Sequence, residues 1–239
     1  MQKSVEMTSF TPDAPRRRVD KSEIERRLAD AIADNRLPPG VHLPEGRLAK
    51  FFGAGRTVIR DVLRDLAGQH LVTLLPNRGA MVSAPSVEET RQICEARRVI
   101  EAAMVRLAAS RMRTPDLTKL RRLVEQEEQA WQAGDHHEAV RRSREFHTGL
   151  AGLAGNEILA ATLQNILSRS SLSAALYGER RDPGCLCHDH FAIIDALEAG
   201  DIDRTEALMI EHLTRIEQRM RLDRNQDDVS IEDALRNTP

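Results

Sequence analysis

Residues 37–82 decide the fold of the first part of the chain, and they read LPPGVHLPEGRLAKFFGAGRTVIRDVLRDLAGQHLVTLLPNRGAMV. Apolar side chains recur at helical spacing from about residue 45 to 52 and again from about residue 56 to 69. The tripeptide Gly53-Ala54-Gly55 separates the two runs and supplies a tight turn. Two helices joined by a short turn that contains glycine are typical of a helix-turn-helix.

A short β-hairpin is predicted directly after these two helices. Residues 72–75 and 80–83 have the apolar composition of short strands, and residues 76–79 (Pro-Asn-Arg-Gly) form the loop between them. A further helix is predicted before the helix-turn-helix, where Ser22 and Glu25 have the spacing of a capping box. Three helices followed by a hairpin predict a winged helix-turn-helix.

The remainder of the chain has a helical pattern. Only seven of the 239 residues are aromatic, and residues 86–222 contain six amphipathic stretches, which favours helices over β-sandwiches. The predicted fold class is therefore mostly α, with an N-terminal winged helix-turn-helix, a short β-hairpin wing and an all-α helical bundle after it. The predicted limits are 1–19 for a flexible basic arm, 20–84 for the winged helix, 86–222 for the bundle and 223–239 for a polar tail.

Charge is divided unevenly between the two predicted domains. The whole chain has a net charge of -2, but residues 1–85 hold 14 Lys and Arg against 10 Asp and Glu. Residues 86–239 hold the other 21 basic and 27 acidic residues. A basic front part followed by an acidic rear part is the division expected if only the front part contacts a polyanion.

The second helix of a helix-turn-helix enters the DNA major groove with its first turn. Arg56 and Arg60 lie one helical turn apart on the face opposite the apolar positions of this helix. One arginine can bind guanine through two hydrogen bonds while its neighbours bind phosphate. In the wing, Gly79 allows the backbone to approach a sugar-phosphate edge. The predicted DNA-binding residues are Gly55, Arg56, Thr57, Arg60, Arg64, Arg78 and Gly79.

Neither a membrane span nor a secretory signal is visible in the sequence. No apolar run approaches the roughly 20 residues that cross a bilayer, and the first 19 residues lack an apolar core. The spacing of Cys94, Cys185 and Cys187 does not suggest a disulfide framework, and C-x-C followed by H-x-H at residues 185–190 does not match structural zinc sites. We expect a cytoplasmic protein in a reducing compartment, without membrane contact.

Three histidines lie on the apolar faces of three different predicted helices. They are His147, His190 and His212, and each has apolar neighbours at helical spacing. A single histidine on such a face is usually a core residue whose hydrogen bonds are satisfied. Three imidazoles that converge in a helical bundle instead suit Zn, Ni or Fe.

These residues and motifs resemble a known family. PPG, LA, G-x-x-R-T-x-x-R, LV and PNRGA follow one another as in the N-terminal winged helix of GntR-type bacterial transcription regulators. The segments EARRVIEAAMVRLAA, FHTGLAGLAGN, HFAIIDALEAGD and MIEHL resemble the all-helical FCD effector domain of the FadR-like branch. Six rear helices are closer to the VanR-like variant than to the seven-helix FadR form. Two departures are Gly55, where Ser or Thr usually caps the recognition helix, and Val58, where Pro is frequent.

The resemblance implies a metal site with one departure from the family pattern. It makes His147, His190 and His212 the ligands of one divalent ion, Zn or Ni, together with an aspartate four residues before the first histidine. Ser143 occupies that position here. Glu145 does not replace the aspartate, because two residues on a helix rotate by about 200°. Either the three histidines hold the metal with water or effector, or the site binds metal weakly or not at all.

The resemblance also implies a small organic acid as effector. In FCD-like domains the arginine that matches Arg97 reaches into the cavity and holds a carboxylate, whereas the alternative is a salt bridge to Glu101 one turn along the helix. Ser143, Asn165 and Arg169 are the further candidates for effector binding.

Together these features predict a homodimeric DNA-binding regulator of the repressor type. Its FCD-like ligand-binding and dimerisation domain senses the small carboxylate effector and changes binding to operator DNA, and dimers match palindromic half-sites. One alternative is a metal-dependent enzyme in which the three histidines activate water, but no general base lies nearby and the winged helix has no role. The other alternative is a DNA-binding scaffold that senses no ligand.

Overall fold

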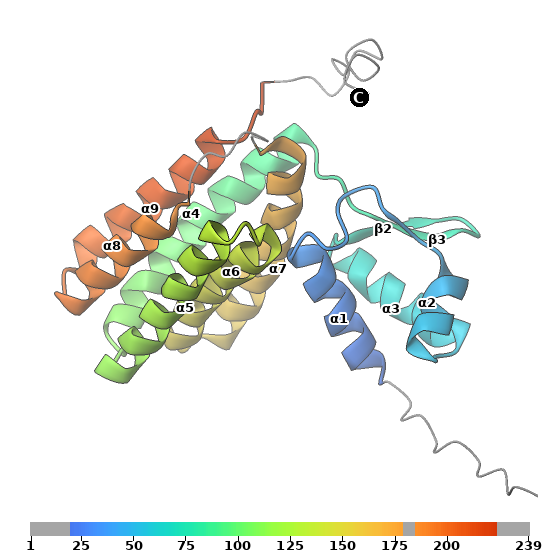
Figure 1. The fold of residues 1–239 in the computed structure, drawn as a ribbon, viewed down its shortest axis with the longest axis horizontal. Coiled ribbons are helices and arrows are strands. Elements are labelled where there is room, and N and C mark those ends of the chain that lie inside the picture. Colours follow the sequence, from blue (N-terminus) through green and yellow to red (C-terminus); the bar gives the residue numbers. More distant parts are fainter. Residues whose placement is uncertain (1–19, 179–184, 224–239) are drawn as a thin grey trace, which may run out of the picture.

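The computed structural model describes residues 20–178 and 185–223, which form two parts that lie side by side (Figure 1). One part is small and carries the strands, and the other is a bundle of long helices. The predicted arm at 1–19 and all but the first residue of the predicted tail at 223–239 lie outside the described residues.

The small part has the predicted order of helices and hairpin. Its sheet also contains a two-residue strand that the sequence did not reveal, and the antiparallel order of the sheet is β1-β3-β2. The elements are α1 (Lys21–Ala33), β1 (His42–Leu43), α2 (Glu45–Phe52), α3 (Arg56–Gly68), β2 (Val72–Leu75) and β3 (Gly79–Val82). This arrangement is a winged helix-turn-helix.

The prediction that Ser22 caps α1 is wrong. Asp20 is the N-cap, and its carboxylate accepts hydrogen bonds from the backbone N of Lys21 and from the hydroxyl of Ser22. Both Asp and Ser are good N-cap residues, so the pattern left the choice to local geometry. At the first helix of the bundle a serine does cap the N-terminus, because the Ser86 hydroxyl accepts a hydrogen bond from the backbone N of Glu89.

The core of the winged helix is apolar and includes one residue from the bundle. Ile24 and Ile32 of α1 pack with Ile59 and Leu66 of α3 and with residues of the sheet. Leu172, from the bundle, is fully buried in the same cluster. Since burial of apolar surface is the main stabilising contribution to a fold, the small domain depends in part on its neighbour.

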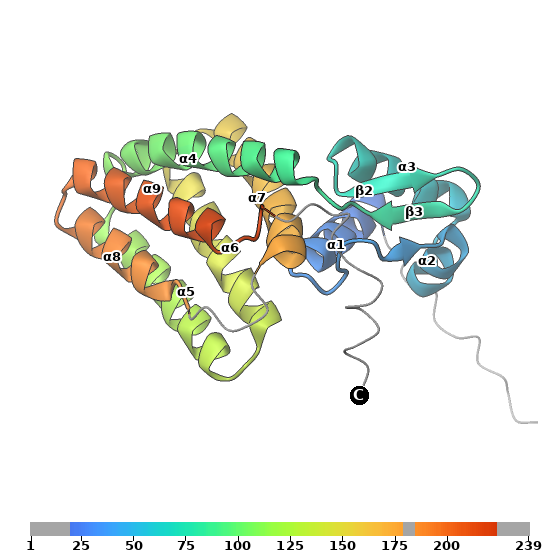
Figure 2. The ribbon, with the colours of Figure 1, turned by 90° about the horizontal axis from the view of Figure 1, so that it is seen from above.

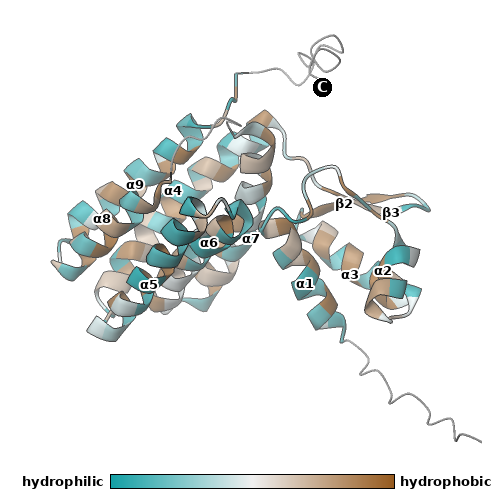
Figure 3. Cartoon of the chain, in the orientation of Figure 1, coloured by the Kyte–Doolittle hydropathy of each residue, from teal (hydrophilic) through white to brown (hydrophobic). Residues whose placement is uncertain are grey.

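Within residues 86–178 and 185–223, six helices form the bundle, as predicted: α4 (Val87–Ala109), α5 (Thr114–Gln132), α6 (His136–Leu153), α7 (Glu157–Tyr177), α8 (Cys187–Glu198) and α9 (Ile202–Gln218). Seen from above, α4 and α9 run beside each other, and the winged helix adjoins the end of the bundle at α7 (Figure 2). Hydrophobic and hydrophilic residues alternate along the helices, as in amphipathic segments (Figure 3). In the described part of the chain, no helix combines the length and hydropathy of a membrane span.

Candidate functional site

The first turn of α3 presents the predicted DNA-binding side chains to solvent. Arg56, Thr57, Arg60 and Arg64 are all exposed. Gly55 is the N-cap, and no side chain caps this helix end. The sequence indicated that this helix lacks a capping side chain, and the structure agrees. The backbone N–H groups of the first turn therefore remain available to an anion such as phosphate.

The three arginines of α3 differ in their contacts. Arg60 donates two hydrogen bonds to Glu45 of α2, at 3.0 and 2.8 Å, and this contact holds the pKa of Glu45 below its usual value. Arg64 pairs with Asp61 at 3.0 Å. Arg56 forms no ion pair with any residue that the structure describes. Arg56 is thus the arginine that can bind DNA without giving up a contact within the protein.

The wing places Arg78 at an exposed position between β2 and β3. The adjacent Gly79 has φ +91°, and a Cβ there would lie 2.4 Å from the backbone oxygen of Leu43. Glycine is therefore required at this position by the close approach of β1. The approach of Gly79 to a sugar-phosphate edge stays a prediction.

The three histidines of the bundle converge, as their pattern predicted. His147 of α6, His190 of α8 and His212 of α9 are almost completely buried. One ring nitrogen from each lies within 4.8 Å of the other two. We call these residues the histidine trio.

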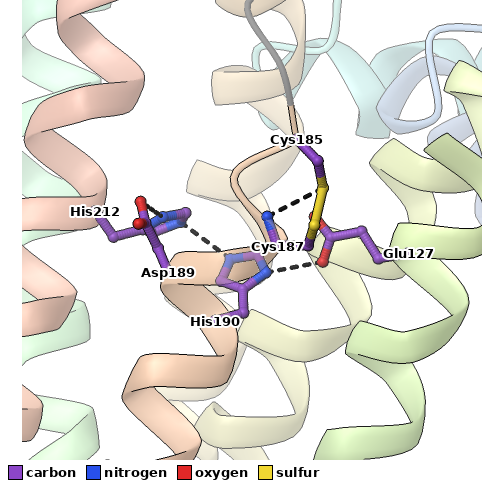
Figure 4. The surroundings of a disulfide bond; sticks show 6 residues. All are labelled: Glu127, Cys185, Cys187, Asp189, His190 and His212. Carbon is purple, nitrogen blue, oxygen red and sulfur yellow. Dashed lines mark hydrogen bonds and ion pairs between the residues drawn. A yellow bond between two sulfur atoms is a disulfide. The ribbon is translucent and has the colours of Figure 1, made fainter. Parts of the chain in front are cut away.

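Each member of the histidine trio contacts a buried or half-buried carboxylate through Nδ1. His147 pairs with Glu101 of α4. His190 Nδ1 lies 2.8 Å from Glu127 of α5, and His212 Nδ1 lies 3.3 Å from Asp189 of α8 (Figure 4). Carboxylates that fix ring orientation in this way are a recurrent feature of histidine metal sites.

These contacts determine where the imidazole protons lie. A carboxylate can only accept, so Glu127 and Asp189 place the protons of His190 and His212 on Nδ1. The two Nε2 atoms then face each other 3.0 Å apart, each with a lone pair. A cation between them, whether a proton or a metal ion, removes this repulsion. The donor set of the histidine trio therefore fits a divalent metal ion.

Burial favours the neutral imidazole at His147 and at His212. Burial lowers the pKa of His147 below its usual value, although Glu101 opposes the shift. Burial also lowers the pKa of His212, and His190 adds to this effect. Burial alone would raise the pKa of Glu101, but Arg97 and His147 outweigh it and bring that pKa well below its usual range. Neutral imidazole is the form that binds metal.

Arg97 adjoins the histidine trio from α4. Its Nε donates to Glu101 at 2.7 Å, which is the salt bridge that the sequence offered as the alternative role, and both side chains are buried. Its guanidinium also donates to the Ser170 hydroxyl at 3.0 Å and lies 3.5 Å from His147 Nε2. Arg97 can form the salt bridge to Glu101 and still contact His147, because a guanidinium group has five N–H donors.

A cavity of about 150 Å³ extends from His147 of the histidine trio to Asn35 at the domain boundary. Arg97, Ser143, His147 and Ser170 line one part of it. Its lining also includes Asn35, which follows α1, and Arg144 of α6. Among the described residues, Asn35 Oδ1 and Arg144 Nε are buried without a hydrogen-bond partner. The cavity thus offers both an acceptor and a donor to a polar ligand.

Two predicted effector residues lie elsewhere. Asn165 Nδ2 donates to the backbone oxygen of Gln69 at 3.0 Å, across the domain boundary. Arg169 pairs with Glu89 at 2.5 Å. Neither residue belongs to the lining of the cavity, and their part in effector binding stays a prediction.

Arg144 joins the bundle to the winged helix. It pairs with Asp34 at 2.7 Å, and Asp34, which follows α1 as its C-cap, is buried. The backbone oxygen of Asp34 also contacts His137 Nδ1 at 2.9 Å. The Asp34 carboxylate lies at the C-terminus of α1, where the helix dipole is also negative. The positive charge of Arg144 therefore stabilises both the carboxylate and the helix end. The sequence did not reveal this contact.

Cys185 and Cys187 are joined by a disulfide, which the sequence did not lead us to expect (Figure 4). Their separation of two residues is too short to belong to a disulfide framework of the usual kind, because such frameworks link distant segments. Cys94 is free and buried.

A winged helix with a basic recognition helix, joined to an all-helical domain, is the architecture of a DNA-binding regulator. Residues 20–82 match the model of the bacterial regulatory proteins of the gntR family, and residues 92–215 match the FCD domain. The chain belongs to the GntR family of bacterial regulatory proteins and carries an FCD domain.

Individual relatives agree with this assignment. The chain is 26% identical to the HTH-type transcriptional repressor RspR of Escherichia coli, over 83% of this chain and 88% of that protein. It is 25% identical to the HTH-type transcriptional regulator LutR of Bacillus subtilis, over 78% and 94%. The structure of Escherichia coli McbR/YncC has the same fold, with a TM-score of 0.76, 21% identity and coverage of 83% and 97%. The family consists of transcription regulators, so the chain is not an enzyme and that interpretation of the histidine trio is rejected.

Proposed function

We propose that this regulator is a homodimeric repressor whose bundle binds a small carboxylate effector beside a divalent metal ion, and that the bound state alters operator binding. The observation that carries the proposal is the facing pair of Nε2 atoms of His190 and His212, 3.0 Å apart, while His147 of the same trio lines a cavity together with Arg97. Similarity to a protein named as a repressor, RspR, supports the direction of control. A dimer would match the two half-sites of a palindromic operator.

The DNA contacts of the proposal come from α3 and the wing. Arg56 would read a base edge, and Thr57 and the uncapped backbone N–H groups of the first turn would bind phosphate. Arg60 would remain oriented by Glu45 while its exposed edge meets the backbone of the duplex. The exposed basic side chains Arg64 of α3 and Arg78 of the wing would add further phosphate contacts.

In the bundle, the histidine trio would hold Zn or Ni, and Ser143 would leave a ligand position to water or effector. A bound divalent ion would supply a Lewis-acidic position for one carboxylate oxygen. Arg97 would hold the effector's negative charge, because its donors beyond the Glu101 pair point toward His147. Burial strengthens such a charge-assisted contact.

Transmission to the winged helix would pass through α6. The cavity lining includes Ser143, Arg144 and His147 from this helix, and Arg144 also pairs with Asp34 beyond α1. An anionic effector in the cavity would compete with Asp34 for Arg144. Loss of that pair would leave Asp34 with Arg36 of its own domain as its remaining ion-pair partner and loosen the contact between domains.

The first test measures the melting temperature of the zinc-loaded protein with and without each of a set of small mono- and dicarboxylic acids. We expect at least one acid to raise the melting temperature and to change the affinity for operator duplex, measured by fluorescence anisotropy. Arg97→Ala should abolish the melting shift. Arg144→Ala should retain the melting shift but lose the change in operator affinity.

Arg141→Ala is the matched control for Arg144→Ala. Arg141 lies on the same helix, but its ion pairs are with Glu138 and Glu145 of that helix. This variant should respond to the acid as the wild type does. If no carboxylate shifts the melting temperature, or if Arg144→Ala responds normally, the sensing proposal or its route through α6 is wrong.

A further inference from the structure

The start of α8 gathers two sulfur atoms, an imidazole and a carboxylate beside the histidine trio. Donor atoms of Cys187, His188 and Glu128 all lie within 4.8 Å of one another. Cys185 Sγ is bonded to Cys187 Sγ and accepts a hydrogen bond from Cys187 N at 3.0 Å, so it lies at the same place (Figure 4). We call Cys185, Cys187, His188 and Glu128 the thiol cluster.

Two members of the thiol cluster lack another partner. Across the described residues, neither Glu128 nor His188 forms a hydrogen bond or an ion pair. Their chain neighbours Glu127, Asp189 and His190 are all engaged with the histidine trio. The Glu128 carboxylate and the His188 imidazole lie near a sulfur atom and have no hydrogen bond or ion pair among the described residues. Both groups therefore remain available to a ligand.

The thiol cluster is open to solvent on one side. Cys187 is buried, Cys185 and Glu128 are half-buried, and His188 is exposed. An ion can therefore enter past His188 without passing through the core. The thiol cluster and the histidine trio are separate sites. His188 and His190 point to different faces of α8, and Glu127 and Glu128 point to different faces of α5.

We propose that the reduced thiol cluster binds one zinc ion and that oxidation to the Cys185–Cys187 disulfide releases it. Two thiolates, one imidazole nitrogen and one carboxylate oxygen are all donors that Zn²⁺ accepts, and four donors satisfy its preferred coordination. In the disulfide the two sulfurs are uncharged and bonded to each other, so the site loses both thiolate ligands. This inference does not depend on metal in the histidine trio.

The two states interconvert by ordinary thiol chemistry. A dithiol reductant gives two electrons and two protons to the disulfide, which becomes two thiols while the reductant becomes a cyclic disulfide. Zinc then displaces the two thiol protons. In the reverse direction a peroxide takes two electrons from the two zinc-bound sulfurs and, with two protons, becomes two waters. The disulfide forms and Zn²⁺ leaves with its own oxidation state unchanged.

The C-x-C spacing argued against a zinc site because sequence alone supplies only the donors of α8 and the residues just before it. Glu128 comes from α5, more than fifty residues earlier in the chain. The packing of α5 against α8 brings this fourth donor to the sulfurs. A site made by tertiary contact has no spacing signature.

Cobalt substitution tests the proposal, because cobalt bound by thiolates gives a charge-transfer absorption band. Cobalt bound by the histidine trio, which has no sulfur, does not give this band. The full chain, reduced with a dithiol and desalted without air, is titrated with Co²⁺. We expect a thiolate-to-cobalt charge-transfer band in the near ultraviolet that saturates when the thiol cluster holds one cobalt ion per chain and disappears when zinc is added. Oxidation with peroxide should abolish the band and release one zinc per chain from zinc-loaded protein.

Variants separate this site from the histidine trio. Cys185→Ser and His188→Asn should weaken cobalt binding at the thiol cluster at least tenfold, whereas Cys94→Ser and the exposed-histidine control His136→Asn should leave it unchanged. His212→Ala should keep the band, even if the histidine trio proves unable to hold metal. Absence of the band in reduced wild-type protein, or its persistence in Cys185→Ser with unchanged affinity, would overturn the proposal.

Discussion

The two domains differ in what they bury. Of the twelve polar or charged side chains that are buried among the described residues, eleven belong to the bundle and one, Asp34, to the winged helix. The winged helix has an apolar core of the ordinary kind, while the bundle surrounds three histidines, two glutamates and an arginine with apolar side chains. Since buried charges are costly unless paired, the contrast makes the bundle the domain in which the proposed binding site lies.

The largest effect that tests this contrast concerns Leu172. Leu172→Ala should lower the free energy of unfolding by about 2–5 kcal/mol, because the side chain is fully buried in the winged-helix core. Urea denaturation measures the loss. Leu176→Ala, one turn along α7 and 37% exposed, should cost well under half as much. Equal losses in the two variants would mean that the bundle does not support the core of the winged helix.

The next effect concerns metal binding by the bundle. Ser143→Asp should raise the affinity of the histidine trio for zinc, because residue 143 lies one turn before His147 and lines the same cavity. At a hundredfold excess of free zinc over its dissociation constant, bound zinc stabilises the fold by about 2.7 kcal/mol. Melting curves with zinc and with chelator measure the effect. A variant that melts lower than wild type under both conditions would show that the new carboxylate is buried without a metal partner.

A smaller effect is expected on the exposed side of the winged helix. Arg56→Ala should weaken specific operator binding by about 1–3 kcal/mol and leave the melting temperature unchanged, because Arg56 is exposed and makes no ion pair among the described residues. Fluorescence anisotropy at fixed salt measures the loss. Arg26→Ala removes an exposed arginine of α1 whose ion pairs with described residues lie within its own helix, and this variant should have much less effect. Equal affinities for wild type and Arg56→Ala would remove α3 from DNA recognition.

The smallest effect concerns the start of the recognition helix. Gly55→Ser should stabilise the winged helix by a few tenths of a kcal/mol, because Gly55 is an N-cap without a side-chain hydrogen bond and has open space around its Cα. Chemical denaturation of both proteins in parallel resolves a difference of this size. Gly55→Ala is the control and should not stabilise. A stabilised alanine variant would point to chain entropy instead of capping.

Most of the fold was predictable because it rests on local patterns. Apolar periodicity and the Gly53–Gly55 turn gave the helix-turn-helix, and the six helices of the bundle follow from their own amphipathic patterns. β1 was missed because two residues carry no period, and the cap of α1 was misplaced because Asp20 and Ser22 are both suitable.

The candidate site was predictable only in part. The pattern placed His147, His190 and His212 together, but it did not show the carboxylates that orient them. Glu127 had one visible signal, since it lies on the apolar face of its helix with Leu120 and Val124. The contact of Arg144 with Asp34 joins two domains and left no trace in either local pattern.

The most direct test of the account is the metal content of the histidine trio, measured in a chain without the thiol cluster's sulfurs. Cys185→Ser/Cys187→Ser protein is loaded with zinc or nickel, desalted and analysed for metal, beside the same protein with His212→Ala. The account predicts one ion per chain in the first protein and a loss of bound metal in the second. No bound metal in the first protein after loading with either ion would contradict it.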